Sequence, residues 1–102
     1  MTIELFKWDI YEITAQEPIH GVMLRGRLRK LFLEQNRNLL AENAKDTENV
    51  VRVAVPHDED IELLRDYLKK IIPNSTVKLI LTNTKNPVLS KLKVNREERY
   101  AL

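Results

Sequence analysis

The residues from 17 to 32, EPIHGVMLRGRLRKLF, contain both glycines of the chain and a run of arginines. They would place a glycine-containing loop directly before a helix N-terminus, whose first N–H groups lack intrahelical partners and whose dipole favours an anion. Gly21 would allow a positive φ and a close approach of a ligand to the backbone. Arg25, in the first helical turn, could donate two parallel hydrogen bonds to a phosphate. The pattern predicts either an anion site or an ordinary turn into a basic helix.

The elements that would position this loop follow from the periodicity of the apolar residues and from the breaks at proline. β-branched and aromatic residues alternate in some segments, whereas apolar residues recur three and four positions apart in others. The expected elements are a strand within 3–15, a helix from 22 to about 35, strands at 39–43 and 50–55, a helix at 58–72, a strand at 76–82, and one more strand within 88–102.

This order of elements, βαββαβ, predicts an α+β fold of the ferredoxin-like type. Its antiparallel sheet would have four or five strands, with two helices on one face. The strands at 39–43 and 50–55 would form a hairpin. A chain of 102 residues is long enough for one core, so we expect a single domain over residues 1–102.

The composition limits the classes of function. The net charge is +2, which argues weakly against a dedicated nucleic-acid binder, and the absence of cysteine excludes a thiolate nucleophile and a cysteine zinc site. The acidic residues near the start and the absence of a long apolar run predict a cytoplasmic protein that does not enter a membrane. The two histidines, His20 and His57, are predicted to be surface or loop residues rather than metal ligands.

The heptapeptide IHGVMLR resembles the signature of the acylphosphatase family, G-x-V-Q-G-V-x-[FY]-R. Gly21, Val22 and Arg25 are identical to the signature. Ile19 takes the place of its valine, and His20 takes the place of its glutamine. The order of elements in that family is also βαββαβ, so the resemblance covers nearly the whole chain.

Two further segments are similar to the same family. The segment LLAEN at 39–43 resembles the second strand, G-W-V-x-N, and places Asn43 at the catalytic asparagine. The segment ERYAL resembles the common ending in an arginine and a tyrosine, here Arg99 and Tyr100.

The resemblance implies hydrolysis of a carboxyl-phosphate mixed anhydride to a carboxylate and inorganic phosphate, without a metal or other cofactor. Arg25 would hold the phosphoryl group, and Asn43 would orient the attacking water. The loop amides would bind the substrate, which implies binding residues Ile19, His20, Gly21, Val22, Met23 and Leu24. The expected partners are an acyl phosphate or inorganic phosphate, with no nucleic acid, and the chain would be a monomer or a weak homo-oligomer.

Two other functions stay open. Glu17 stands where the family usually has glycine, His20 replaces glutamine, and the turn at 44–49 is longer than usual. These differences support a second hypothesis, in which the chain is an inactive relative that binds an anion or a protein. The fold class also includes RNA-binding modules, which stack bases on aromatic residues of the sheet. The strands VVRVAV and TVKLILT carry no aromatic residue, so this hypothesis ranks lower.

Several charged residues and one glycine have simpler interpretations. Asp9, Glu12 and the acids in the first turn of the expected helix at 58–72 are interpreted as solvated charges or partners of the helix dipole, not as an acid–base pair. The basic residues Arg27, Arg29 and Lys30 would form the exposed face of the first helix and could attract an anionic substrate. Gly26 would either leave room beside Arg25 or allow close packing on a strand.

Overall fold

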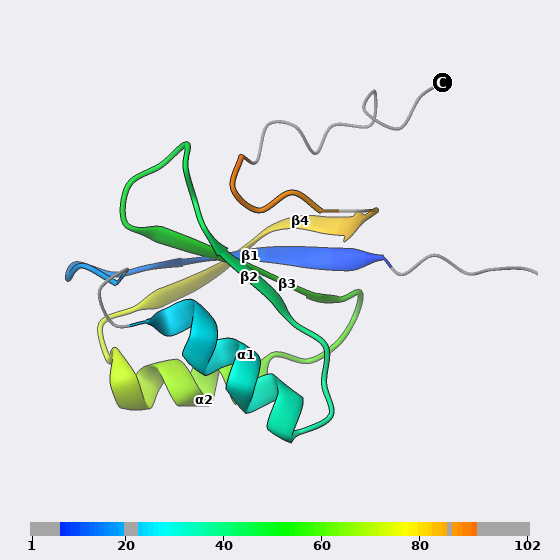
Figure 1. Ribbon diagram of the computed structural model, residues 1–102, viewed down its shortest axis with the longest axis horizontal. Helices are drawn as coiled ribbons and strands as arrows, with labels where there is room; N and C mark the ends of the chain where they lie inside the picture. Colours follow the sequence, from blue (N-terminus) through cyan, green and yellow to red (C-terminus); the bar gives the residue numbers. More distant parts are fainter. Residues whose placement is uncertain (1–6, 20–22, 86, 92–102) are drawn as a thin grey trace, which may run out of the picture.

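A computed structural model describes residues 7–19, 23–85 and 87–91 of the chain (Figure 1). Its strands pair antiparallel in the order β2-β3-β1-β4, and both helices lie on one face of the sheet. This is the ferredoxin-like α+β arrangement, which confirms the predicted fold class. The elements in chain order are β1 (Trp8–Thr14), α1 (Leu24–Glu34), β2 (Leu40–Asn43), β3 (Val50–Pro56), α2 (Glu62–Ile71) and β4 (Thr76–Thr84).

The start of the second helix differs from its prediction. Residues 58–60 lie before α2, which begins at Glu62. Asp58 has a φ of 63°, in the left-handed region, which an α-helix does not continue through. The Asp60 carboxylate lies outside the helix and accepts a hydrogen bond of 2.7 Å from the N–H of Glu62, the first residue of α2. The expected helix at 58–72 was therefore too long at its N-terminus.

The expected last strand within 88–102 is not present at residues 87–91, which have no regular secondary structure. Residues 92–102, where the rest of that expectation falls, lie outside the described part of the chain. Over the residues that the structure does describe, neither helix is long and apolar enough to cross a membrane.

The main core lies between the sheet and the two helices. α1 contributes Leu24, Leu28 and Phe32, and α2 contributes Leu64 and Leu68. These side chains share one face of each helix because they are three or four positions apart. They pack against the inward residues of the sheet, which are Tyr11, Ile13, Ala41, Val51, Val53 and Val55.

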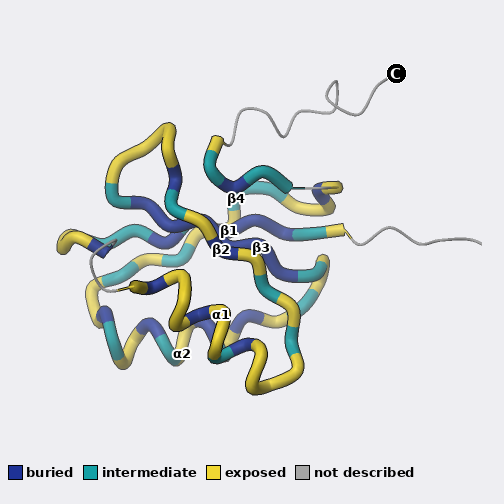
Figure 2. The backbone as a smooth tube through the Cα atoms, viewed as in Figure 1, coloured by how far each residue is buried: buried dark blue, intermediate teal, exposed yellow. Residues whose placement is uncertain are grey.

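The central part of the opposite face of the sheet is also covered. Ile10, Ala54 and Leu89 form a second apolar cluster there, with Trp8 and Leu81 packed against it. Residues 87–91 run beside β4 on the side of the sheet away from the helices (Figure 2). Because β3 is covered on both faces, six of its seven residues are buried.

A buried arginine, Arg52, lies beneath this second cover. Its side chain is 3% exposed, and it lies directly opposite Glu12 in the register between β1 and β3. Nε donates to Glu12 at 2.8 Å, and Nη1 donates to Asp46 at 2.6 Å and to the Leu89 carbonyl at 3.2 Å. Arg52 therefore joins β1, the β2–β3 loop and the covering segment. Glu12, predicted to be solvated, is instead part of this ion pair.

Replacing Arg52 with methionine should lower the free energy of unfolding by about 1–3 kcal/mol. The Leu89 carbonyl would lose a buried donor, whereas the Glu12 and Asp46 side chains, 23% and 28% exposed, could regain water. Urea denaturation measures the change. Arg65→Met, on the exposed side of α2, is the matched control and should change the stability by less than about 0.5 kcal/mol. Equal effects of the two substitutions would contradict the role of Arg52.

Candidate functional site

The topology brings Asn43 to the end of the sheet at which β1 finishes and the β1–α1 loop begins. β1 and β2 are both antiparallel to β3, so they run in the same direction and their C-terminal ends share one edge. Asn43 is paired with Val51, and Val51 is paired with Ile13 near the end of β1. Two strand spacings, about 10 Å, separate the two backbones in this row. Asn43 is half-buried as the last residue of β2.

The N-terminus of α1 faces this edge without a side-chain cap. Met23 precedes the helix with a φ of 55° and makes no capping hydrogen bond through its side chain, and the first turn contains no acidic residue. By their positions in the helix, the N–H groups of Leu24, Arg25 and Gly26 have no intrahelical partner. Arg25 is exposed as the second residue of α1. The expected binding residues His20, Gly21 and Val22 lie outside the described residues.

The other expected binding residues have different surroundings. The Ile19 and Leu24 side chains are buried in the core, whereas Met23 is 75% exposed. The Ile19 N–H donates a hydrogen bond of 2.8 Å to Oδ1 of Asn49. A bound anion would have to displace Asn49 to reach this N–H, so the Ile19 N–H is not a free donor for an anion.

The arginines of α1 do not share one environment. The Arg29 guanidinium donates to the Ala41 carbonyl of β2, so this side chain ties the helix to the edge strand. Arg27, Arg29 and Lys30 are all exposed, as predicted. The backbone at Gly26 is open, since a Cβ built there would meet no described atom within 4 Å. Of the two interpretations of Gly26, close packing on a strand is therefore wrong.

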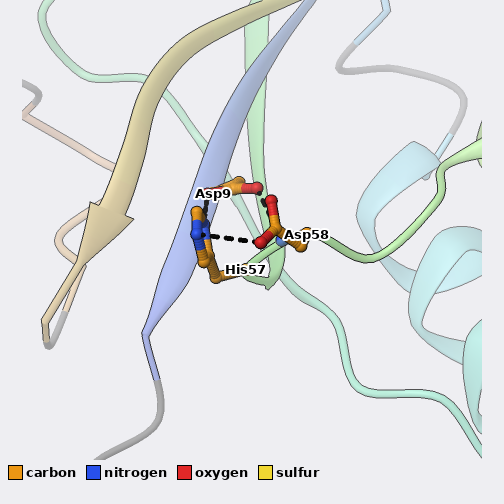
Figure 3. A group of neighbouring side chains, drawn as sticks. All are labelled: Asp9, His57 and Asp58. Atoms are coloured by element: carbon orange, nitrogen blue, oxygen red, sulfur yellow. Dashed lines mark hydrogen bonds and ion pairs between the residues drawn. The ribbon is translucent and has the colours of Figure 1, made fainter.

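A second polar cluster, which the sequence did not predict, lies at the opposite edge of the sheet. It consists of Asp9 at the start of β1 and of His57 and Asp58 in the turn after β3 (Figure 3). Asp9 was expected to be solvated, but its side chain is only 7% exposed. The sequence shows that His57 and Asp58 directly follow the predicted strand that ends near Pro56. Only the pairing of β1 with β3 reveals that Asp9 lies beside them.

The Asp9 carboxylate accepts three hydrogen bonds. Oδ1 accepts from His57 Nδ1 at 2.8 Å and from the Asn83 N–H at 3.1 Å, and Oδ2 accepts from the Asp58 N–H at 3.1 Å. The Asn83 N–H is free for this contact because β4 has a bulge here and Asn83 takes a φ of 58°. One carboxylate thus joins β1, the β3–α2 turn and β4.

These contacts shift two pKa values in opposite directions. The pKa of His57 is raised mainly by its hydrogen bond to Asp9, with contributions from the charges of Asp58 and Asp9, while desolvation and the charge of Lys7 oppose the shift. Burial acts to raise the pKa of Asp9, but the hydrogen bonds from His57, Asn83 and Asp58 outweigh it, so this pKa is lowered. The folded state therefore favours a charged pair.

Asp9, His57 and Asp58 each offer one possible metal-ligand atom, and these atoms lie within 4.8 Å of one another. Both Asp9 oxygens, however, already accept hydrogen bonds from the protein. His57 Nε2 lies 3.2 Å from Oδ2 of the exposed Asp58, as in an ordinary ion pair. This arrangement fits a structural tie, and we assign no metal to it.

Comparison with protein-family models, with curated protein sequences and with solved structures finds no match to this chain. The candidate site therefore depends on the residues themselves and on the topology that places them.

The Asp9–His57 pair should make stability depend on pH. The folded pKa of His57 lies above the ordinary value of 6.5, so its contribution is complete below pH 6.5 and is lost as the pH rises through the folded pKa. The contribution of Asp9 is complete above its ordinary value of 3.8 and is lost as the pH falls through its lower folded pKa. Urea denaturation between pH 5 and pH 9 should show falling stability at the alkaline end.

His57→Gln should flatten this decline, and His20→Gln, at the other histidine of the chain, should retain it. An unchanged profile in His57→Gln would contradict the assignment.

Gly26→Ala should raise the free energy of unfolding by about 0.5–1 kcal/mol, because glycine in a helix loses more backbone entropy on folding than alanine. The open space around Gly26 lets the methyl group enter without a clash. Thermal and urea denaturation measure the change, and a loss of stability would show that the space is occupied in solution.

Proposed function

We propose that this chain is an acylphosphatase-like hydrolase that cleaves acyl phosphates to a carboxylate and inorganic phosphate. The observation that supports the proposal most directly is the position of Arg25 and Asn43. Arg25 lies in the first turn of an uncapped helix, and Asn43 ends the strand that reaches the same edge of the sheet. These are the two residues that the family resemblance assigns to catalysis.

The chemistry requires positioning more than covalent catalysis. A water molecule attacks phosphorus, the bond between phosphorus and the acyl oxygen breaks, and the carboxylate leaves with its electron pair. The proton of the attacking water goes to phosphate or solvent. Donors aimed at the non-bridging oxygens stabilise the transition state, because negative charge is spread over these atoms. No protein nucleophile is needed.

In this mechanism Arg25 and the N–H groups at the start of α1 bind the phosphoryl oxygens, and the Asn43 amide orients the water. The positive end of the α1 dipole adds to the attraction, since no acidic residue in the first turn offsets it. A resident metal or other cofactor is not part of the proposal.

The alternative is an anion-binding module of the same shape without turnover. It is favoured by the Ile19 N–H, which donates to Asn49 rather than remaining free for a phosphoryl group. Exposed Glu17 lies in the same loop and would repel an anion that approached it.

An RNA-binding function has less support from the arrangement of the sheet. Modules of that class stack bases on an open sheet face. Here residues 87–91 cover the central part of the face away from the helices, and Leu89 is buried against Ile10 and Ala54.

Arg25→Gln and Asn43→Ala should each lower kcat/KM for benzoyl phosphate by at least about 100-fold, the usual loss when one transition-state donor is removed. Arg27→Gln is the matched control, since it removes an exposed arginine two residues further along α1. It should retain most of the activity. Circular dichroism and urea denaturation should show that all three variants are folded.

Hydrolysis is measured without added metal, and phosphate binding is followed by NMR in the same samples. Phosphate binding near Arg25 without turnover would favour the binding module. A wild-type protein that neither binds phosphate nor hydrolyses benzoyl phosphate would exclude both functions.

A further inference from the structure

The side chain of Asn49, in the β2–β3 loop, binds the first part of the β1–α1 loop, residues 15–19. Oδ1 of Asn49 accepts the Ile19 N–H at 2.8 Å, and Nδ2 donates to the Ala15 and Glu17 carbonyls, each at 2.9 Å. The two amide hydrogens and the carbonyl oxygen of this side chain are all used. The contacts reach both ends of the segment 15–19, so this segment cannot shift without breaking several of them.

Asn49 is the last residue of the β2–β3 loop, 44–49, and other residues of this loop also form hydrogen bonds to the rest of the structure. The Ala44 N–H donates to the Val50 carbonyl at 2.9 Å and closes the loop, and the Lys45 N–H donates to the Ser90 carbonyl at 2.8 Å. Asp46 accepts from buried Arg52. The loop 44–49 is thus fixed to the sheet and to the segment that covers it.

The backbone at Asn49 explains why this residue type suits the position. Its φ of 54° is in the left-handed region, which asparagine and glycine adopt more readily than other residues. Of these two, only asparagine also supplies one acceptor and two donors.

We propose that Asn49 is a positioning residue for the anion site at the start of α1. This inference rests on the proposed function, because it concerns the same site. Asn43 and Asn49 lie at the two ends of one connection, Asn43 at the end of β2 and Asn49 directly before β3. Through the hydrogen bond from the Ile19 N–H to Asn49, the β2–β3 connection holds Ile19 in position. Residues 15–19 and the end of β2 at Asn43 are therefore held relative to one another.

Asn49→Gly tests the role of the side chain, because glycine tolerates the same backbone conformation. Asn36→Gly is the matched control: Asn36 also has a left-handed φ, 55°, and lies at the far end of α1. Amide hydrogen exchange of Ile19, the affinity for inorganic phosphate by NMR titration, and kcat and KM for benzoyl phosphate are measured on the full chain.

In Asn49→Gly we expect Ile19 to exchange about tenfold faster or more, and the affinity for phosphate and kcat/KM to fall by about tenfold or more. The Ile13 and Val51 amides in the central strand pairs should keep their protection. Asn36→Gly should match the wild type in phosphate affinity and turnover.

Several results would overturn the positioning role. One is faster exchange of Ile19 with unchanged phosphate affinity and turnover, and another is unchanged exchange of Ile19. General loss of protection in β1 and β3 would make Asn49 a stabilising residue of the whole fold and would overturn its specific role.

The failure of the proposed function is distinguishable from these results. If the wild type binds phosphate without turnover, hydrolysis is excluded, and the phosphate affinity of Asn49→Gly alone decides the role of Asn49. If the wild type binds no phosphate, both the proposed function and the positioning role are overturned.

Discussion

The antiparallel register between β1 and β3 is the constraint on which the other features of this structure depend. It places Glu12 opposite Arg52, Ile13 opposite Val51, and Asp9 next to the turn that follows β3. A shift of one residue would turn every side chain of a strand to the other face of the sheet. Arg52 would then face the helices, and the apolar residues beside it would face the covering segment. The buried ion pair and the two apolar clusters therefore require the same register.

The two ends of the strands in the sheet are stabilised in a similar way. At one end of the strands the Asp9 carboxylate accepts three hydrogen bonds, two from the β3–α2 turn and one from β4, and at the other end the Asn49 amide makes three hydrogen bonds to one loop. The difference is chemical. An acceptor-only carboxylate gathers N–H donors and favours a protonated histidine, whereas an amide satisfies both donors and acceptors without adding charge. The uncharged tie lies at the edge where we propose that an anion binds.

The arginines illustrate how position decides the role of a residue type. Arg52 is buried with three acceptors, and Arg37 pairs with Glu59 and lies 5.1 Å from the centre of the Phe32 ring. Arg29 binds a strand carbonyl. Arg25 is exposed at the start of its helix, where the dipole favours an anion. This contrast separates Arg25 from Arg29, Arg37 and Arg52, and it supports the assignment of Arg25 to the proposed site by the family resemblance.

The sequence by itself determined the class of fold, because apolar periodicity and prolines mark the strands and helices through short-range physics. It also marked Gly21 and Arg25 as residues that could form an anion site, and its resemblance to a family added Asn43 as the residue that would orient a water. The tertiary structure alone decided the roles of Asp9, Arg52 and Asn49. Each has partners more than 30 residues away, and a solvated and a buried charge look the same in a sequence. Strand pairing brings these partners together, and the burial that results makes their hydrogen bonds matter for stability and position.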